Sequence, residues 1–168
     1  GSDNAGQLMS ALFEILEELE VVEESGTGES RESPIGMGRI GRVGDYEVSV
    51  TSVTPDATDV VMAENQFNEP PAEGKQFFLT RVAVTYVGSE TGTPWIDLNF
   101  QAVGESNASY TTFNDDCGVI PNPALNVSEL FPGGSAEFNV CWRIDSDDAD
   151  SLVMYVEPLL AFDAEPVW

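Results

Sequence analysis

Two cysteines are the residues of this 168-residue sequence whose chemistry is easiest to name. Cys117 follows Asp115 and Asp116 in an expected loop, and Cys141 lies in the stretch AEFNVCWRI. The two thiols either form a disulfide bond or stay free in a reducing compartment. Because an exposed unpaired thiol is reactive and the count is even, the sequence favours a disulfide. Such a bond would close a loop of about 25 residues and stabilise the fold by roughly 3.5 kcal/mol.

An acidic segment, DSDDAD at 145–150, offers oxygen ligands of the kind that suit Ca²⁺. It departs from an EF-hand loop, because the sixth position is Asp150 instead of glycine and the twelfth is Val156 instead of glutamate. We therefore favour a solvated acidic turn and expect no cofactor. The alternative is a weak calcium site with the candidate ligands Asp145, Asp147, Asp148 and Asp150.

Catalytic groups do not form a familiar pattern. The chain has no histidine, which excludes Ser-His-Asp and Cys-His pairs. Ser135 in GGSAE does not fit a nucleophile elbow, since it precedes a strand. No spacing selects a carboxylate pair for glycoside hydrolysis from the 30 acidic residues. We expect a protein that is not an enzyme, with a cell-envelope hydrolase using a carboxylate pair as the alternative.

The charge balance limits the partners. With 30 acidic and 6 basic residues the formal net charge is −24, so nucleic acid and anionic lipid surfaces would repel the chain. The chain contains no run of eighteen apolar residues, so we expect no direct insertion into a membrane. The acidity also fits adaptation to high salt.

Alternating apolar and polar residues from Asp45 onward predict strands. They lie at 45–50, 95–102 and 136–144, with shorter candidates at 108–113 and 125–131. Two runs, 77–87 and 152–157, are apolar on both faces and are expected to be more central. With no helical period between them, the fold class is all-β. We predict an immunoglobulin-like antiparallel β-sandwich of about seven strands over 45–168, with a barrel as the alternative.

The strand alternation assigns faces to the notable side chains. Cys141 shares its parity with Glu137 and Arg143, so a disulfide there would cross the outer face of a sheet. Trp142 has the opposite parity and is expected in the core. Trp95 is expected to be exposed near a loop end, where it either contacts a protein or carbohydrate ligand or covers the end of the sandwich.

The N-terminal residues 1–24 have a different pattern. Gly1 and Ser2 look like the remnant of a cleaved tag, and 8–24 predicts an acidic amphipathic helix. Its apolar seam needs a partner, which could be its own domain, a second copy or another protein. Residues 25–44, rich in glycine, are expected to be a linker. The seam consists of Leu8, Leu12, Ile15, Leu19 and Val22.

Four segments resemble those of a known family. They are SPIGMGRIGRVGDYEVSVTSV, NQFNEPPAEGKQFFLTRVAVTYVG, DDCGVIPNP and FPGGSAEFNVCW. They are similar to secreted or lipid-anchored surface proteins of actinobacteria and other Gram-positive bacteria. These carry an immunoglobulin-like domain of unknown function, similar in fold to a secreted immunogenic antigen of mycobacteria. The resemblance covers roughly residues 33–168 and implies export, a β-sandwich and a Cys117–Cys141 bond. It brings no catalytic residues.

These observations together predict an extracellular or cell-surface binding or display module whose ligand is an unknown protein or carbohydrate. A lipid anchor would lie upstream of residue 1. The N-terminal helix would then be a stalk, a docking element or a means of self-association through residues 8–24.

Overall fold

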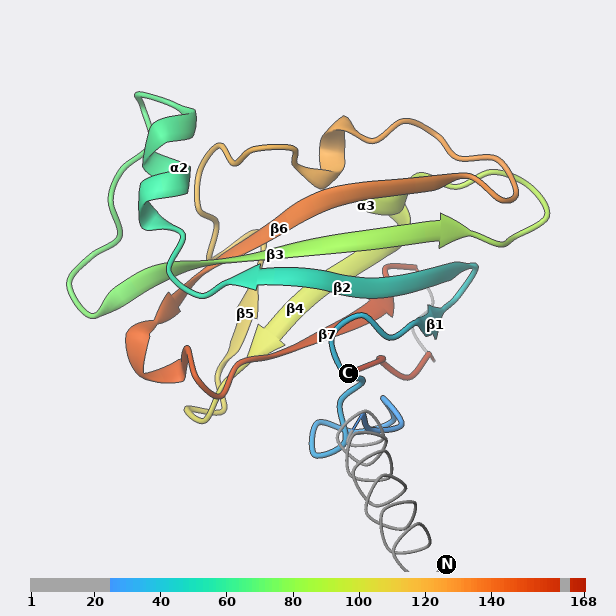
Figure 1. Cartoon of the computed structure of the whole chain (residues 1–168), viewed down its shortest axis with the longest axis horizontal. Helices are drawn as coiled ribbons and strands as arrows, with labels where there is room; N and C mark the ends of the chain where they lie inside the picture. The colour runs from blue at the N-terminus through green and yellow to red at the C-terminus, as the bar shows by residue number, and fades with distance from the viewer. Residues whose placement is uncertain (1–24, 161–163) are drawn as a thin grey trace, which may run out of the picture.

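The fold is an antiparallel β-sandwich, seen in a computed structural model that describes residues 25–160 and 164–168 (Figure 1). Within these ranges one sheet has the strand order β1-β2-β3-β6 and the other the order β5-β4-β7. The prediction of an all-β sandwich with about seven strands is confirmed. The strands are β1 (Gly41–Val43), β2 (Tyr46–Thr54), β3 (Lys75–Tyr86), β4 (Leu98–Val103), β5 (Ser109–Thr111), β6 (Ser135–Asp145) and β7 (Val153–Pro158).

The core lies between the two sheets and follows from the alternation of side chains along the strands. Phe138 and Trp142 of β6 are fully buried, which confirms the core position expected for Trp142. From the opposite sheet, the Phe100 ring meets Phe138 edge-on at 5.7 Å between centroids. The Trp142 indole N–H donates to the carbonyl oxygen of Phe100 at 3.3 Å. The indole therefore fills apolar space without leaving its polar atom unpaired.

A helix that was not predicted covers part of the outer face of the larger sheet. This helix, α2 (Thr58–Glu64), packs through Ala57 and Val61 on Phe77 and Leu79 of β3. It explains why the run 77–87 is apolar on both faces: one face meets the core and the other meets α2. Seven residues make too short a stretch for helical periodicity to be recognised in the sequence.

Other differences from the expected strands have local causes. The strand predicted over 95–102 begins at Leu98, because Pro94 starts the short helix α3 (Pro94–Asp97). The strand predicted over 125–131 is instead η1 (Ala124–Asn126), a single 3₁₀ turn, followed by a loop. β1 was not predicted, and β7 lies at a sheet edge and not in the centre. η2 (Ser146–Asp148) follows β6.

Residues 25–44, expected to be a linker, are instead part of the folded domain. The Ile35 N–H donates to the Trp168 carbonyl at 2.9 Å, and the Trp168 N–H donates to the Gly28 carbonyl at 3.0 Å. Figure 1 shows the part of this segment that precedes β1 beside the C terminus, below β1 and β7. A Cβ at Gly28 would lie 2.7 Å from Ile35, so this glycine permits close packing. The seam residues of the predicted helix at 8–24 lie outside the described residues.

Candidate functional site

The disulfide is present and joins Cys117 to Cys141 with a Cα–Cα distance of 6.0 Å. As predicted, it lies on the outer face of the larger sheet, where Cys141 stands opposite Leu79 of β3. Both cysteines are nevertheless buried, because they pack in the same apolar cluster as Val61 of α2. The bond therefore fastens a loop to a covered part of the sheet.

The fastened loop runs along β6, the edge strand of the larger sheet (Figure 1). The Asn139 N–H donates to the Asn122 carbonyl at 2.8 Å, and the Arg143 N–H donates to the Asp115 carbonyl at 2.7 Å. The Asn139 side chain also donates to the Pro121 carbonyl at 2.8 Å. The loop thus satisfies backbone groups that an open strand edge would expose. Its position is fixed by these bonds together with the disulfide.

Next to this loop lies an apolar cavity of about 290 Å³, which we call the Trp95 groove. Three large side chains at its mouth are strongly exposed: Trp95 at 49 %, Leu125 at 66 % and Phe113 at 80 %. Its floor includes Leu98 and Val140 of the two sheets. The other apolar residues that line it are Phe100, Ile120, Pro123, Ala124 and Leu159.

Trp95 is held at the groove by the short helix α3. Asp97, in the same helix, accepts hydrogen bonds from the Thr93 N–H at 2.9 Å and from the Tyr46 hydroxyl at 2.6 Å. Burial, followed by the hydrogen bond to the Asp97 carboxylate and its charge, raises the pKa of Tyr46 well above its ordinary value. Tyr46 therefore stays protonated as a donor, and α3 is tied to β2.

The polar residues around the Trp95 groove mostly bond to their own surroundings. The Asn139 side-chain amide donates to the Pro121 carbonyl, and the Asp116 carboxylate accepts from the Gly118 N–H at 3.2 Å. The Asn99 amide reaches Glu157 at 3.4 Å. What the groove offers a ligand is therefore mainly aromatic and aliphatic surface, with Asp116 as the acidic residue in its lining.

The sequence identified Trp95 but missed Phe113 and Leu125. Trp95 was expected to be exposed near a loop end, and the structure places it there, in a helical turn and not in a strand. Leu125 was assigned to a strand, where its neighbours would have hidden it. Phe113 was assigned to the end of the strand predicted over 108–113, but β5 ends at Thr111 and Phe113 lies in the loop that follows.

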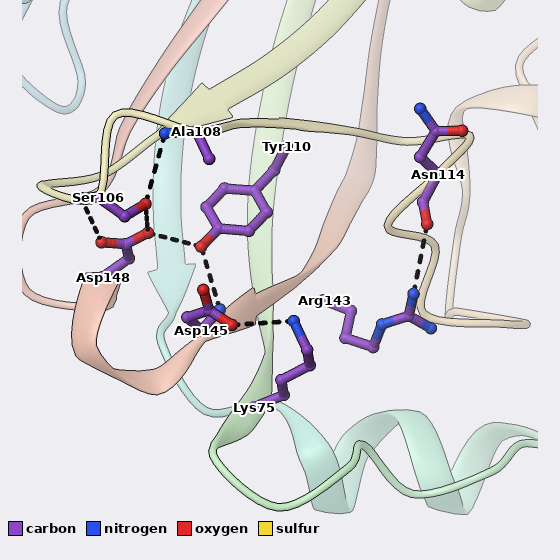
Figure 2. A network of polar contacts seen from close by, with 8 residues as sticks. All are labelled: Lys75, Ser106, Ala108, Tyr110, Asn114, Arg143, Asp145 and Asp148. Atoms are coloured by element: carbon purple, nitrogen blue, oxygen red, sulfur yellow. Dashed lines mark hydrogen bonds and ion pairs between the residues drawn. The ribbon is translucent and has the colours of Figure 1, made fainter.

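A contrasting polar corner forms around Asp148, which is only 1 % exposed (Figure 2). Its carboxylate accepts from the Ser106 N–H at 2.9 Å, from the Ser106 hydroxyl at 2.5 Å and from the Tyr110 hydroxyl at 2.5 Å. Burial alone would raise the pKa of Asp148, but these donors and the charge of Arg31 outweigh it and hold the pKa below its ordinary value. Burial and the bond to Asp148 raise the pKa of Tyr110 to about 12.

The four carboxylates considered for calcium do not converge. Asp148 points inward to its protein donors, while Asp145 points to Lys75, whose ammonium group lies 2.9 Å away (Figure 2). Asp147 and Asp150 are exposed. Within the described ranges no three His, Cys, Asp or Glu side chains gather closely enough to hold a metal ion. The acidic segment acts here as a turn with one buried anchor.

A further cavity of about 520 Å³ lies at the opposite end of β2 from α2 and is lined by Tyr46, Tyr86, Glu90, Asp97 and Glu165, among others. One carboxylate oxygen of Asp97 already accepts hydrogen bonds from Tyr46 and Thr93. Two lining residues, Ala164 and Glu165, directly follow residues outside the described part of the chain. The Trp95 groove is therefore the better defined candidate.

None of the helices in the described part of the chain has the length and apolar character needed to cross a membrane. No family model and no curated protein matches this sequence.

Three solved structures resemble the chain. A conserved hypothetical protein of Bacillus anthracis is 15 % identical, with 79 % of this chain and 94 % of that one covered and a TM-score of 0.48. An uncharacterized β-sandwich protein of Clostridium difficile is 11 % identical, with 78 % and 88 % covered and a TM-score of 0.46. The YjhA protein of Bacillus subtilis is 13 % identical, with 76 % and 85 % covered and a TM-score of 0.45. Similarity this distant supports no statement about function, and the resemblance to surface proteins holds only as far as the β-sandwich.

Proposed function

We propose that this protein is a non-enzymatic binding module that works outside the cell and takes its ligand in the Trp95 groove. The observation that carries this proposal is the exposure of Trp95, Phe113 and Leu125 around a cavity of about 290 Å³. Single exposed apolar residues are ordinary, but large ones gathered around a hollow are typical of binding surfaces. Aromatic anchors of this kind contribute much of the binding energy in protein complexes.

The contacts that hold the walls of the groove in place favour binding as well. The disulfide, the loop bonds to β6 and the Asp97 contacts of α3 hold its walls from different directions. A ligand that enters a preorganised groove loses less free energy to ordering the protein. The partner that suits it best is a protein segment with an aromatic or long aliphatic side chain and basic neighbours, since the chain has a net charge of −24.

The proposed location outside the cell rests on the disulfide, which persists in oxidising compartments, and on the resemblance to surface proteins. In the finer version of this proposal the protein is secreted or displayed on the cell surface, with a lipid anchor upstream of residue 1. The sandwich would be of the immunoglobulin type. The order β2-β3-β6 facing β4-β7 supports that assignment, because it has the pairing of the first, second and fifth strands of such domains facing the third and sixth.

The alternative of an envelope hydrolase has no particular support. Asp97 and Asp148 are the carboxylates most engaged with the fold, and the oxygens of both accept hydrogen bonds from protein donors. A carboxylate pair acting on a glycosidic bond would instead flank a cleft for sugar rings.

Selection of displayed random peptides on the full chain tests the proposal. Enriched peptides are expected to contain an aromatic or long aliphatic residue next to Lys or Arg. Their binding should fall at least about tenfold with Trp95→Ala, as expected for an interfacial anchor. Phe131→Ala is the matched control, because Phe131 is 67 % exposed and does not line the groove. Peptides that bind equally to both variants, or no enrichment at all, would contradict the proposal.

A further inference from the structure

We propose that residues 8–22 form an amphipathic helix that docks in a second apolar groove of the same chain. This Met37 groove, of about 240 Å³, lies between β2 and β7, whereas the Trp95 groove lies beside β6. The inference concerns a different surface and does not depend on the proposed function. The apolar residues that define the groove are Ile35, Met37, Val50, Val53, Leu152 and Met154.

The Met37 groove is an opening in the side of the sandwich. Phe78 and Trp142, which belong to the main core, are among the residues that line it. At the surface, Met37 is 60 % exposed and Val53 39 % exposed. An apolar helix face placed here would continue the core outward and remove this surface from water.

The first described residues lead directly to this groove. The Gly36 N–H donates to the Ser25 hydroxyl oxygen at 2.8 Å, and the Gly26 N–H donates to the Pro34 carbonyl at 2.8 Å. Pro34 and Gly36 both line the groove. Val22, the last residue of the seam, precedes Ser25 by three positions, which allows a reach of roughly 10 Å. The tether is short, so the effective concentration of the segment at the groove is high.

The length of the proposed helix agrees with that of the strand edge that borders the groove. As a helix, residues 8–22 would extend about 22 Å, while residues 49–54, the part of β2 that continues beyond its pairing with β1, extend about 20 Å. The seam positions recur every three or four residues along that length. Most of the apolar stripe can therefore lie beside this strand edge, which gives the helix the partner that its sequence requires.

Charge favours the same pairing. Residues 1–24 contain no Lys or Arg, and their acidic residues are Asp3, Glu14, Glu17, Glu18, Glu20, Glu23 and Glu24. Two of the six basic residues of the chain lie near the groove and add positive charge there: Arg39 lines it, and Arg42 lies in the adjacent strand β1. Most of the remaining surface repels an acidic helix. At this groove the repulsion of the acidic helix is therefore partly offset.

Hydrogen exchange of the full chain, followed by mass spectrometry of peptides that cover residues 8–22, tests the docking. Met37→Glu places a charge in the groove and should speed exchange of these amides by about tenfold, because docking is what keeps them closed. Ile40→Glu is the matched control, since Ile40 is 64 % exposed and does not line the groove. Its exchange should equal that of the wild type.

A reciprocal pair of variants checks the helix side. Leu12→Glu in the seam should speed exchange as Met37→Glu does, whereas Ser10→Glu, on the opposite face of the predicted helix, should not. Equal exchange in Met37→Glu and Ile40→Glu would overturn the proposal. So would exchange that speeds up on dilution, because this would show that the helix is held by a second copy. Peptide binding at Trp95 is measured separately, so the failure of one proposal is distinguishable from the failure of the other.

Discussion

The Asp148 corner and the Trp95 groove both include side chains from the stretch 104–125, yet these side chains lie in opposite environments. At the corner, a carboxylate is buried and bonded to Ser106 and Tyr110. At the groove, large apolar side chains such as Phe113 are left in water. Burying a satisfied charge fixes a loop, whereas leaving apolar surface exposed adds nothing to folding. The first arrangement serves the fold, and the second is available for a ligand.

The largest expected effect comes from breaking the Asp148 corner. Asp148→Ala should reduce the free energy of unfolding by about 4 kcal/mol, because it leaves the buried Tyr110 hydroxyl without its acceptor and removes the carboxylate that anchors the Ser106 loop. Urea denaturation of the purified chain measures this. Asp147→Ala, in the same turn but exposed, should change the stability by less than about 0.5 kcal/mol. Equal losses in the two variants would remove the distinction between the corner and the solvated turn.

The disulfide sharpens the comparison, because it fastens the groove loop and not the Asp148 corner. Replacing Cys117 and Cys141 together by Ser should reduce the stability by about 3.5 kcal/mol in the chain-entropy model. Exchange of the amides of Asn139 and Arg143, which bond to the loop, should speed up more than exchange of the Ser106 amide. Uniform acceleration of all three amides would show that the two regions unfold together.

The two tyrosine–aspartate pairs should give the stability a characteristic pH dependence. Because the pKa of Asp148 is lowered on folding, its contribution is present above the pKa of the unfolded chain and is lost as the solution becomes more acidic. The pKa of Tyr110 is raised to about 12, so its contribution is present below about pH 10 and is lost as pH rises toward 12.

Denaturation midpoints measured across this pH range test both the acidic and the alkaline loss of stability, which form the acidic and alkaline limbs of the profile. Tyr110→Phe should flatten part of the alkaline limb, with the remainder due to Tyr46, whose pKa is also raised. An alkaline limb that is unchanged in Tyr110→Phe would mean that the tyrosine is not buried against Asp148.

The smallest effect on stability is expected in the groove itself. Phe113→Ser should change the free energy of unfolding by less than about 0.5 kcal/mol, because the ring is 80 % exposed. In the same variant, binding of selected peptides should weaken. A loss of stability similar to that of Asp148→Ala would assign Phe113 to the fold and leave the groove without its proposed role.

Much of this arrangement is readable from the sequence because β-strands have a fixed period. The alternation over 136–144 predicted the inward position of Trp142 and the outward direction of Cys141, and both are confirmed. The period of two needs only local residues to be recognised, and it identified the strands β2 and β6, whereas β3 was recognised as a run that is apolar on both faces. The disulfide partners were the sole pair available.

Short elements and loops were decided by contacts distant in sequence. The seven residues of α2 form a helix where Phe77 and Leu79 need a cover, and the segment 25–40 is ordered by bonds to Trp168. Phe113 and Leu125 meet Trp95 only because a loop follows the edge of β6. Such meetings depend on strand order and loop closure, which leave no periodic signal in the chain. The sequence by itself therefore determined which residues face inward, and the tertiary structure alone decided which exposed residues form a site.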